Sequence, residues 1–186
     1  LREPLENGTI TISRAARRSE FPARFQLIAA MNPCPCGYLG STLKACRCTP
    51  DQVLRYQGRL SGPLLDRIDL HVEVPALAAS ELLNAPPGEG TANIRTRCTQ
   101  ARERALARQG KPNQALQGRD IDAHAGLDPA AVKFLNTAAA RMGWSGRAIH
   151  RALKVARTIA DLADAPATQV AHVAEAVQYR RALRSA

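Results

Sequence analysis

Three short segments in the first half of the chain carry apolar patterns typical of strands. Residues Thr9–Arg14 alternate polar and β-branched apolar side chains, which predicts a half-buried strand. Residues Phe25–Met31 form a nearly continuous apolar run, as is typical of a strand covered on both faces of a parallel sheet. Residues Leu70–Pro75 alternate again and end at a proline. The pattern therefore predicts three strands.

The segments around these strands complete the picture of an α/β unit. Residues Leu1–Gly8 have the character of a helix end that stops at an Asn-Gly pair. A cysteine-rich loop follows the second predicted strand, and a helix is expected to begin near Thr49-Pro50. Threonine can cap a helix whose first position is proline. We expect residues 1–84 to form the C-terminal part of an α/β core with a partial parallel sheet.

A linker at residues 85–92, rich in proline and glycine, separates this half from a region with helical patterns alone. In that region apolar residues recur at the spacing of amphipathic helices. The predicted helices cover residues 93–109, 128–142, 145–163 and 168–183. We expect residues 93–186 to form an all-α helical bundle.

Charge and composition narrow the classes of partner and compartment. The net charge is +10, and it is concentrated in residues 91–186, which hold sixteen Lys or Arg and seven Asp or Glu. Such a basic half favours nucleic acid or nucleotide phosphates, although a solvated arginine-rich surface explains it equally well. No apolar run approaches 18 residues, so we expect no membrane span. An odd number of mostly clustered cysteines is unlike a secreted disulfide framework and favours a reducing cytoplasm.

Four of the five cysteines form the pattern Cys-Pro-Cys-x9-Cys-Arg-Cys. They are Cys34, Cys36, Cys46 and Cys48, in the loop at residues 34–48. Four thiolates are what a tetrahedral structural zinc site requires, although the usual zinc spacing is Cys-x2-Cys. The alternative is a loop with four reduced thiols, and its content of glycine, serine and basic residues argues against their burial in a core. Cys98 stands apart from the cluster and is not expected to join it.

A combination of segments then identifies the family that the chain resembles. The second predicted strand is followed by Asn32-Pro-Cys-Pro-Cys-Gly37, and later by Arg59-Leu-Ser-Gly-Pro-Leu-Leu-Asp-Arg67-Ile-Asp-Leu70. The opening Leu-Arg-Glu-Pro-Leu-Glu and the segment Ser145-Gly-Arg147-Ala-Ile belong to the same pattern. Together these resemble the magnesium-chelatase-like AAA+ ATPases, and within them the ComM/YifB-type competence proteins. The resemblance extends over nearly the whole chain.

This resemblance implies an AAA+ module whose helical bundle acts as a lid over the nucleotide. Such a module uses ATP and Mg²⁺ and assembles into a homo-oligomeric ring, expected to be a hexamer. Its phosphate-binding loop has the form GxxxxGK[ST], and no such motif is present in these residues. We therefore expect the chain to be the C-terminal part of a longer protein, and inactive as an ATPase by itself.

The resemblance also assigns roles to three residues. Asn32 corresponds to sensor 1, which orients the attacking water, although Asn-Pro is also an ordinary strand-ending turn. Arg67 corresponds to an arginine finger donated to the ATP of a neighbouring subunit. Without the resemblance, Arg67 would be a surface residue paired with Asp66 or Asp69. Arg147, in the first turn of a predicted helix where a cation opposes the helix dipole, corresponds to sensor 2 on the lid.

Three functions remain open on these grounds. The leading one is the sensor, finger and lid portion of a ring ATPase that acts on DNA, as the ComM-like resemblance implies for natural transformation. A second is a chelatase subunit that drives insertion of a metal into a porphyrin. The third is a non-enzymatic, zinc-stapled basic module that binds nucleic acid. A phosphate-binding loop upstream of Leu1 would distinguish the ATPase from the binding module.

Overall fold

The computed structural model describes residues 2–14, 17–77 and 83–180, and the chain divides into two units. The first unit contains the described residues up to Ile68 and those of 74–77. The second contains Asp69–Glu73 and the described residues from Leu83 onward. The short segment Asp69–Glu73 therefore belongs with the helices of the second unit.

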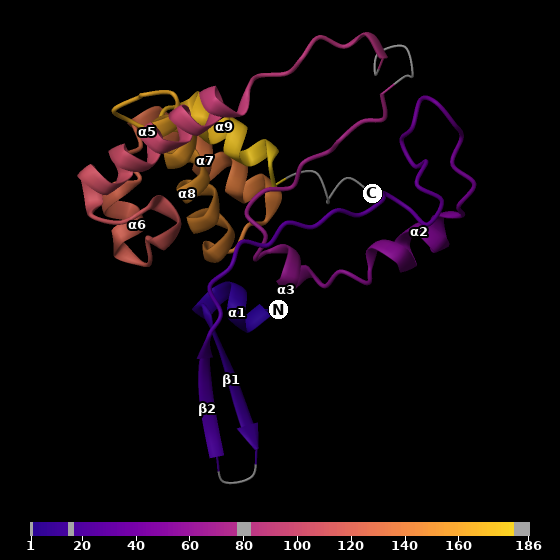
Figure 1. The fold of residues 1–186 in the computed structure, drawn as a ribbon, viewed down its shortest axis with the longest axis horizontal. Coiled ribbons are helices and arrows are strands. Elements are labelled where there is room, and N and C mark those ends of the chain that lie inside the picture. Colours follow the sequence, from indigo (N-terminus) through magenta and orange to yellow (C-terminus); the bar gives the residue numbers. More distant parts are fainter. Residues whose placement is uncertain (1, 15–16, 78–82, 181–186) are drawn as a thin grey trace. The chain divides into compact units, whose positions relative to one another are not determined.

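The first unit begins with helix α1 (Arg2–Asn7), followed by a β-hairpin drawn as two antiparallel arrows in Figure 1. Strand β1 (Thr9–Arg14) pairs with β2 (Arg17–Pro22) in a register that places Arg14 opposite Arg17. The strand predicted at Thr9–Arg14 is confirmed. Because side chains alternate between the two faces, one face of the hairpin carries Ile10, Ile12 and Phe21, all of which are exposed.

The predicted parallel sheet is wrong for the described residues. Their paired strands are the antiparallel β1 and β2, while Phe25–Met31 and Leu70–Pro75 have irregular structure. Ile28 and Val74, from the middle of these two segments, are 84% and 85% exposed. A strand is held by hydrogen bonds to a neighbouring strand, and none of the described residues supplies such a neighbour here. An apolar run without a partner stays irregular despite its high strand propensity.

The described residues of the first unit also form two further helices, α2 (Pro50–Gln57) and α3 (Gly62–Leu65). The predicted start of α2 is confirmed: the Thr49 hydroxyl accepts from the Gln52 N–H, and the Gln52 side chain accepts from the Thr49 N–H. This reciprocal capping box satisfies two backbone donors that a helix N-terminus otherwise leaves unpaired. The N-cap places α2 directly after the cysteine-rich loop.

The second unit is helical, as predicted. It contains α5 (Thr91–Gln109), the 3₁₀ turn η1 (Asn113–Ala115), α6 (Arg119–His124), α7 (Pro129–Met142), α8 (Gly146–Leu162) and α9 (Val170–Gln178). Local signals set the helix ends: Asp128 and Ser145 cap α7 and α8, and Gly143 ends α7 in the left-handed conformation. Among the described residues, no helix has the length and apolar character that crossing a bilayer requires.

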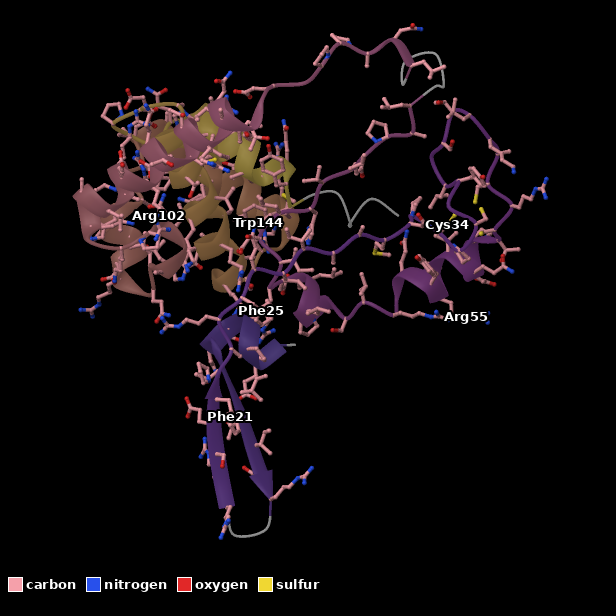
Figure 2. All side chains as sticks on the ribbon, viewed as in Figure 1. Phe21, Phe25, Cys34, Arg55, Arg102 and Trp144 are labelled. Atoms are coloured by element: carbon pink, nitrogen blue, oxygen red, sulfur yellow. The ribbon has the colours of Figure 1, made fainter. Side chains whose placement is uncertain are left out.

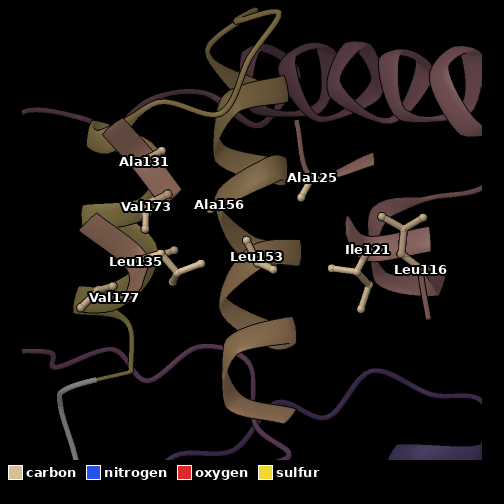
Figure 3. Packing of buried hydrophobic residues seen from close by; sticks show 10 residues of the cluster. Leu116, Ile121, Ala125, Ala131, Leu135, Leu153, Ala156, Val173 and Val177 are labelled. Atoms are coloured by element: carbon tan, nitrogen blue, oxygen red, sulfur yellow. The ribbon is translucent and has the colours of Figure 1, made fainter. Parts of the chain in front are cut away.

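Helix α8 lies at the centre of the helical core (Figure 3). Its side chains Leu153 and Ala156 lie between α7 and α9 on one side and the residues of α6 on the other. Four alanines recur at every fourth position and are almost completely buried, namely Ala148, Ala152, Ala156 and Ala160. Small side chains at this spacing let neighbouring helices approach closely along one ridge. The core is accordingly rich in alanine, leucine and valine, as the low aromatic content predicts.

Candidate functional site

The four clustered cysteines come together in space. Sulfur atoms are visible beside α2, near the Cys34 label in Figure 2. The Sγ of Cys34 is 3.4 Å from that of Cys36 and 3.7 Å from that of Cys46, and Cys36 and Cys46 are 3.6 Å apart. All four Sγ atoms, including that of Cys48, lie within 4.8 Å of one another. These separations exceed the roughly 2.0 Å of a disulfide, so the thiols are free.

The spacing of the sulfur atoms fits a tetrahedral metal site. Four sulfurs bound to zinc at about 2.3 Å are separated from one another by about 3.8 Å, the edge of the tetrahedron. The three sulfur separations among Cys34, Cys36 and Cys46, 3.4 to 3.7 Å, are close to this edge. Cys34 is fully buried and the other three are partly buried, which suits a structural site closed to substrate. The residues therefore form a cluster that could hold one metal ion.

The backbone around the cluster is shaped by a glycine turn and by α2. The Gly37 N–H donates to the Cys34 carbonyl at 3.0 Å, and Gly37 has φ of +81°, a conformation that other residues rarely adopt. This turn brings Cys34 and Cys36 close together. The Cys48 N–H points at the Cys46 sulfur at 3.4 Å. The Gln57 side chain of α2 donates to the Pro33 carbonyl at 3.0 Å, which ties the start of the loop to the helix.

The surroundings lower the pKa of two of the four thiols, Cys34 and Cys36, and raise the pKa of the other two, Cys46 and Cys48. Backbone N–H groups of Arg47 and Tyr38 lower the pKa of Cys36 to about 6, because they stabilise the thiolate. Desolvation, together with the neighbouring thiols, raises the pKa of Cys48 to about 12. Four thiolates cannot accumulate at such short range without a compensating cation. A bound dication would supply that charge and deprotonate all four sulfurs.

Asn32, the predicted sensor 1, lies directly before the cysteine loop. Its side chain is exposed and lies close to Gly37. A β-carbon added at Gly37 would be 3.7 Å from the side-chain amide of Asn32. It follows an irregular segment rather than the predicted strand. The sensor role of Asn32 stays a prediction.

Arg67, the predicted arginine finger, forms an ion pair with Glu6 in α1. The Arg67 Nε and Nη2 both donate to Glu6 Oε2, with an Nε–O distance of 3.0 Å, and Nη1 donates to the Pro63 carbonyl at 2.7 Å. The Arg67 side chain is 13% exposed. The sequence suggested Asp66 or Asp69 as partners, and Glu6 was missed. It lies 61 residues away, and no local pattern links the two.

Arg147, the predicted sensor 2, is exposed in the first turn of α8, which Ser145 caps by accepting from the Ala148 N–H at 3.3 Å. One turn further along α8, Arg151 is bound to Asp69 at 2.5 Å. The His71 N–H also donates to the Tyr179 carbonyl at 2.7 Å. Asp69 and His71, which belong to the second unit, are thus held to its helices by a side-chain and a backbone contact.

Two family models match the chain in succession. The model for magnesium chelatase, subunit ChlI, matches residues 1–82, and the model for the ChlI C-terminal region matches residues 88–180. The two matches meet near the predicted linker at residues 85–92. Together they cover almost every described residue of both units.

Full-length relatives resemble the chain over nearly its whole length. It is 46% identical over 185 residues, 99% of the chain, to a competence protein ComM of Haemophilus influenzae. It is 46% and 44% identical, over 97% of the chain, to proteins named YifB of Salmonella typhimurium and Escherichia coli, which carry no described function. The chain spans 35% to 36% of the length of these relatives.

Proposed function

The chain belongs to the magnesium chelatase ChlI family, and on this premise we propose that it is the sensor, arginine-finger and lid portion of an AAA+ ring ATPase that acts on DNA. The observation that carries the proposal is the paired family match, which spans both the unit with Asn32 and Arg67 and the unit with Arg147. ATP and Mg²⁺ are the cofactors of the complete protein. Its partners are neighbouring subunits of a homo-oligomeric ring and DNA, in the cytoplasm.

In this proposal each of the three residues acts on the phosphates of ATP. Asn32 orients the attacking water, because its amide can accept from water and donate to phosphate. Arg67 reaches the ATP of the neighbouring subunit and stabilises the charge of the transferring phosphoryl group. Arg147 contacts the nucleotide of its own subunit and links the nucleotide state to the position of the helical unit.

We further propose that the cysteine cluster holds one structural Zn²⁺. Cys34, Cys36, Cys46 and Cys48 would be the ligands, and the ion would supply the dicationic charge that four close thiolates require. Cys98, exposed on α5, is not part of the site. The role of the metal is to hold the loop at residues 34–48 in one conformation beside α2.

Loss of one thiol should remove the metal. We expect the purified protein to carry about one zinc equivalent, with sulfur ligands at about 2.3 Å by X-ray absorption. Cys36→Ser should lose most of the bound zinc and lower the melting temperature, whereas the matched variant Cys98→Ser should retain the full equivalent. Metal-free wild-type protein whose melting curve is unchanged by a chelator would contradict the proposal.

The hairpin offers a specific candidate surface for DNA. Arg14, Arg17 and Arg18 are exposed near its tip, and within the described part of the chain none of them forms an ion pair. The register sets Arg14 directly opposite Arg17. Two like charges in this position destabilise a hairpin unless an anion lies nearby. A two-stranded ribbon also has the width to enter the major groove of DNA.

Neutralising the hairpin arginines should weaken DNA binding in a salt-dependent way. For Arg14→Gln/Arg17→Gln/Arg18→Gln in the intact protein, we expect the slope of log K against log salt on duplex DNA to fall by roughly 2 to 3, since each phosphate contact contributes about 0.9. Fluorescence anisotropy across a salt series measures this slope. The control Arg95→Gln/Arg102→Gln removes two exposed arginines of α5 and should change the slope little. The opposite ranking would place the DNA contact on the helical unit.

Two other functions are alternatives to this proposal. A zinc-stapled, non-enzymatic nucleic-acid-binding module is favoured by the sulfur geometry, and a chelatase subunit by the family description. ATP hydrolysis by the intact protein separates the ATPase from the binding module. Stimulation of that hydrolysis by DNA, and not by a porphyrin with Mg²⁺, separates the DNA-acting ring from the chelatase. Absence of ATP hydrolysis by the assembled protein would contradict the proposed function.

A further inference from the structure

We propose that Glu6 is a positioning residue for Arg67, holding its guanidinium ready for a phosphate; this inference rests on the proposed function. The contact is specific. Nε and Nη2 of Arg67 both donate to one carboxylate oxygen of Glu6, and Nη1 donates to the Pro63 carbonyl. Three nitrogens of one side chain are therefore fixed by two separate elements of the same unit, α1 and the first turn of α3.

The contacts hold the guanidinium in place but use only some of its N–H donors. A guanidinium has five N–H donors, and three are used by Glu6 and Pro63, so two remain for an incoming anion. The Arg67 side chain is 13% exposed, so most of its surface is covered by the protein. A free arginine must lose rotamer entropy when it binds a phosphate. The contacts with Glu6 and Pro63 already restrict these rotamers, which lowers that cost.

The charge of Glu6 matters as well as its geometry. Its carboxylate compensates the buried part of the Arg67 charge, so that the guanidinium is stable in place when no nucleotide is present. A phosphate bearing more negative charge can still attract the two remaining N–H groups. Glutamine at position 6 would keep the size of the side chain and one carbonyl acceptor but would lose the charge, so it tests this point directly.

The test is a kinetic comparison of Glu6→Gln, Arg67→Ala and the double variant in the intact protein. We expect Glu6→Gln to lower kcat for ATP hydrolysis at least about tenfold, with KM for ATP nearly unchanged, because Arg67 acts on phosphoryl transfer at a neighbouring subunit. In the Arg67→Ala background, Glu6→Gln should have no further effect, because Glu6 acts through Arg67. A residue that only supports the fold would lower activity in both backgrounds.

Glu3→Gln is the matched control, since Glu3 is exposed on the same short helix. It should leave kcat within about twofold of wild type, as is usual for exposed charges. In NMR spectra of the chain, the Arg67 Nε–H signal should exchange slowly with water and lose that protection in Glu6→Gln. If Arg67→Ala hydrolyses ATP normally, the finger assignment itself fails. If Arg67→Ala is inactive but Glu6→Gln matches wild type, or if its effect persists in the double variant, the positioning role of Glu6 is wrong.

Discussion

Arg67→Ala in the intact protein is expected to lower the rate of ATP hydrolysis by roughly 10³-fold or more, the usual cost of losing an arginine finger. Binding of ATP by the variant subunit should stay close to wild type, because in the proposed function Arg67 acts on the nucleotide of a neighbour. Steady-state hydrolysis and equilibrium nucleotide binding measure the two effects separately. The control Arg55→Ala removes an exposed arginine of α2 and should leave both unchanged.

Mixed rings test whether Arg67 acts between subunits. Subunits with Arg67→Ala should be partly rescued by subunits that lack the lysine of the phosphate-binding loop, because an intact finger can then face an intact pocket. Even rescue of a few per cent is measurable against a background lowered by about 10³. Normal hydrolysis by Arg67→Ala within an assembled ring would reduce Arg67 to a structural partner of Glu6.

Asp161→Asn is expected to destabilise the helical unit by about 3–5 kcal/mol, the cost of breaking a buried ion pair from one side. Asp161 is 1% exposed and accepts hydrogen bonds from Arg108, Arg157 and Asn113. Arg157 is itself 2% exposed and donates to Asp161 at 2.7 Å. Without the carboxylate, a buried guanidinium would keep its charge with no anion beside it. Urea denaturation of the chain, followed by the helical circular dichroism signal, measures the loss.

Asp164→Asn is the control for this prediction. Asp164 is 75% exposed, pairs with Arg104 at 2.7 Å, and has a positive φ that asparagine tolerates. Its replacement should cost less than about 1 kcal/mol, as is usual for an exposed ion pair. Equal losses of unfolding free energy in the two variants would show that the burial of Asp161 adds nothing to the stability of the helical unit. A loss below about 1 kcal/mol in Asp161→Asn would likewise contradict the expected role of the buried network.

The pKa of Asp161 sets the pH range of this stabilisation. Burial raises the pKa of this carboxyl, but the hydrogen bonds from Arg108, Arg157 and Asn113 outweigh it and hold the pKa below the ordinary value of 3.8. A lowered pKa in the folded state means that the contribution is fully present above 3.8 and is lost as the pH falls through the lowered value. The network is therefore intact at neutral pH.

Features that depend on neighbouring residues in the chain were determined by the sequence alone. The cap Thr49 was predicted correctly because it forms its hydrogen bond within three residues, and the caps Asp128 and Ser145 span the same short distance. The four cysteines likewise lie within one loop, so their spacing alone indicated a cluster. The helical bundle followed from apolar stripes that repeat with the period of a helix.

Only the tertiary structure decided the pairings between distant parts of the chain. The runs Phe25–Met31 and Leu70–Pro75 have the composition of strands, yet a strand forms only where a second strand accepts its hydrogen bonds, and composition does not reveal that partner. The partners of ion pairs are also decided by the tertiary structure. Arg67 has aspartates next to it in sequence but binds Glu6, because the fold and not the sequence distance sets which carboxylate lies within reach.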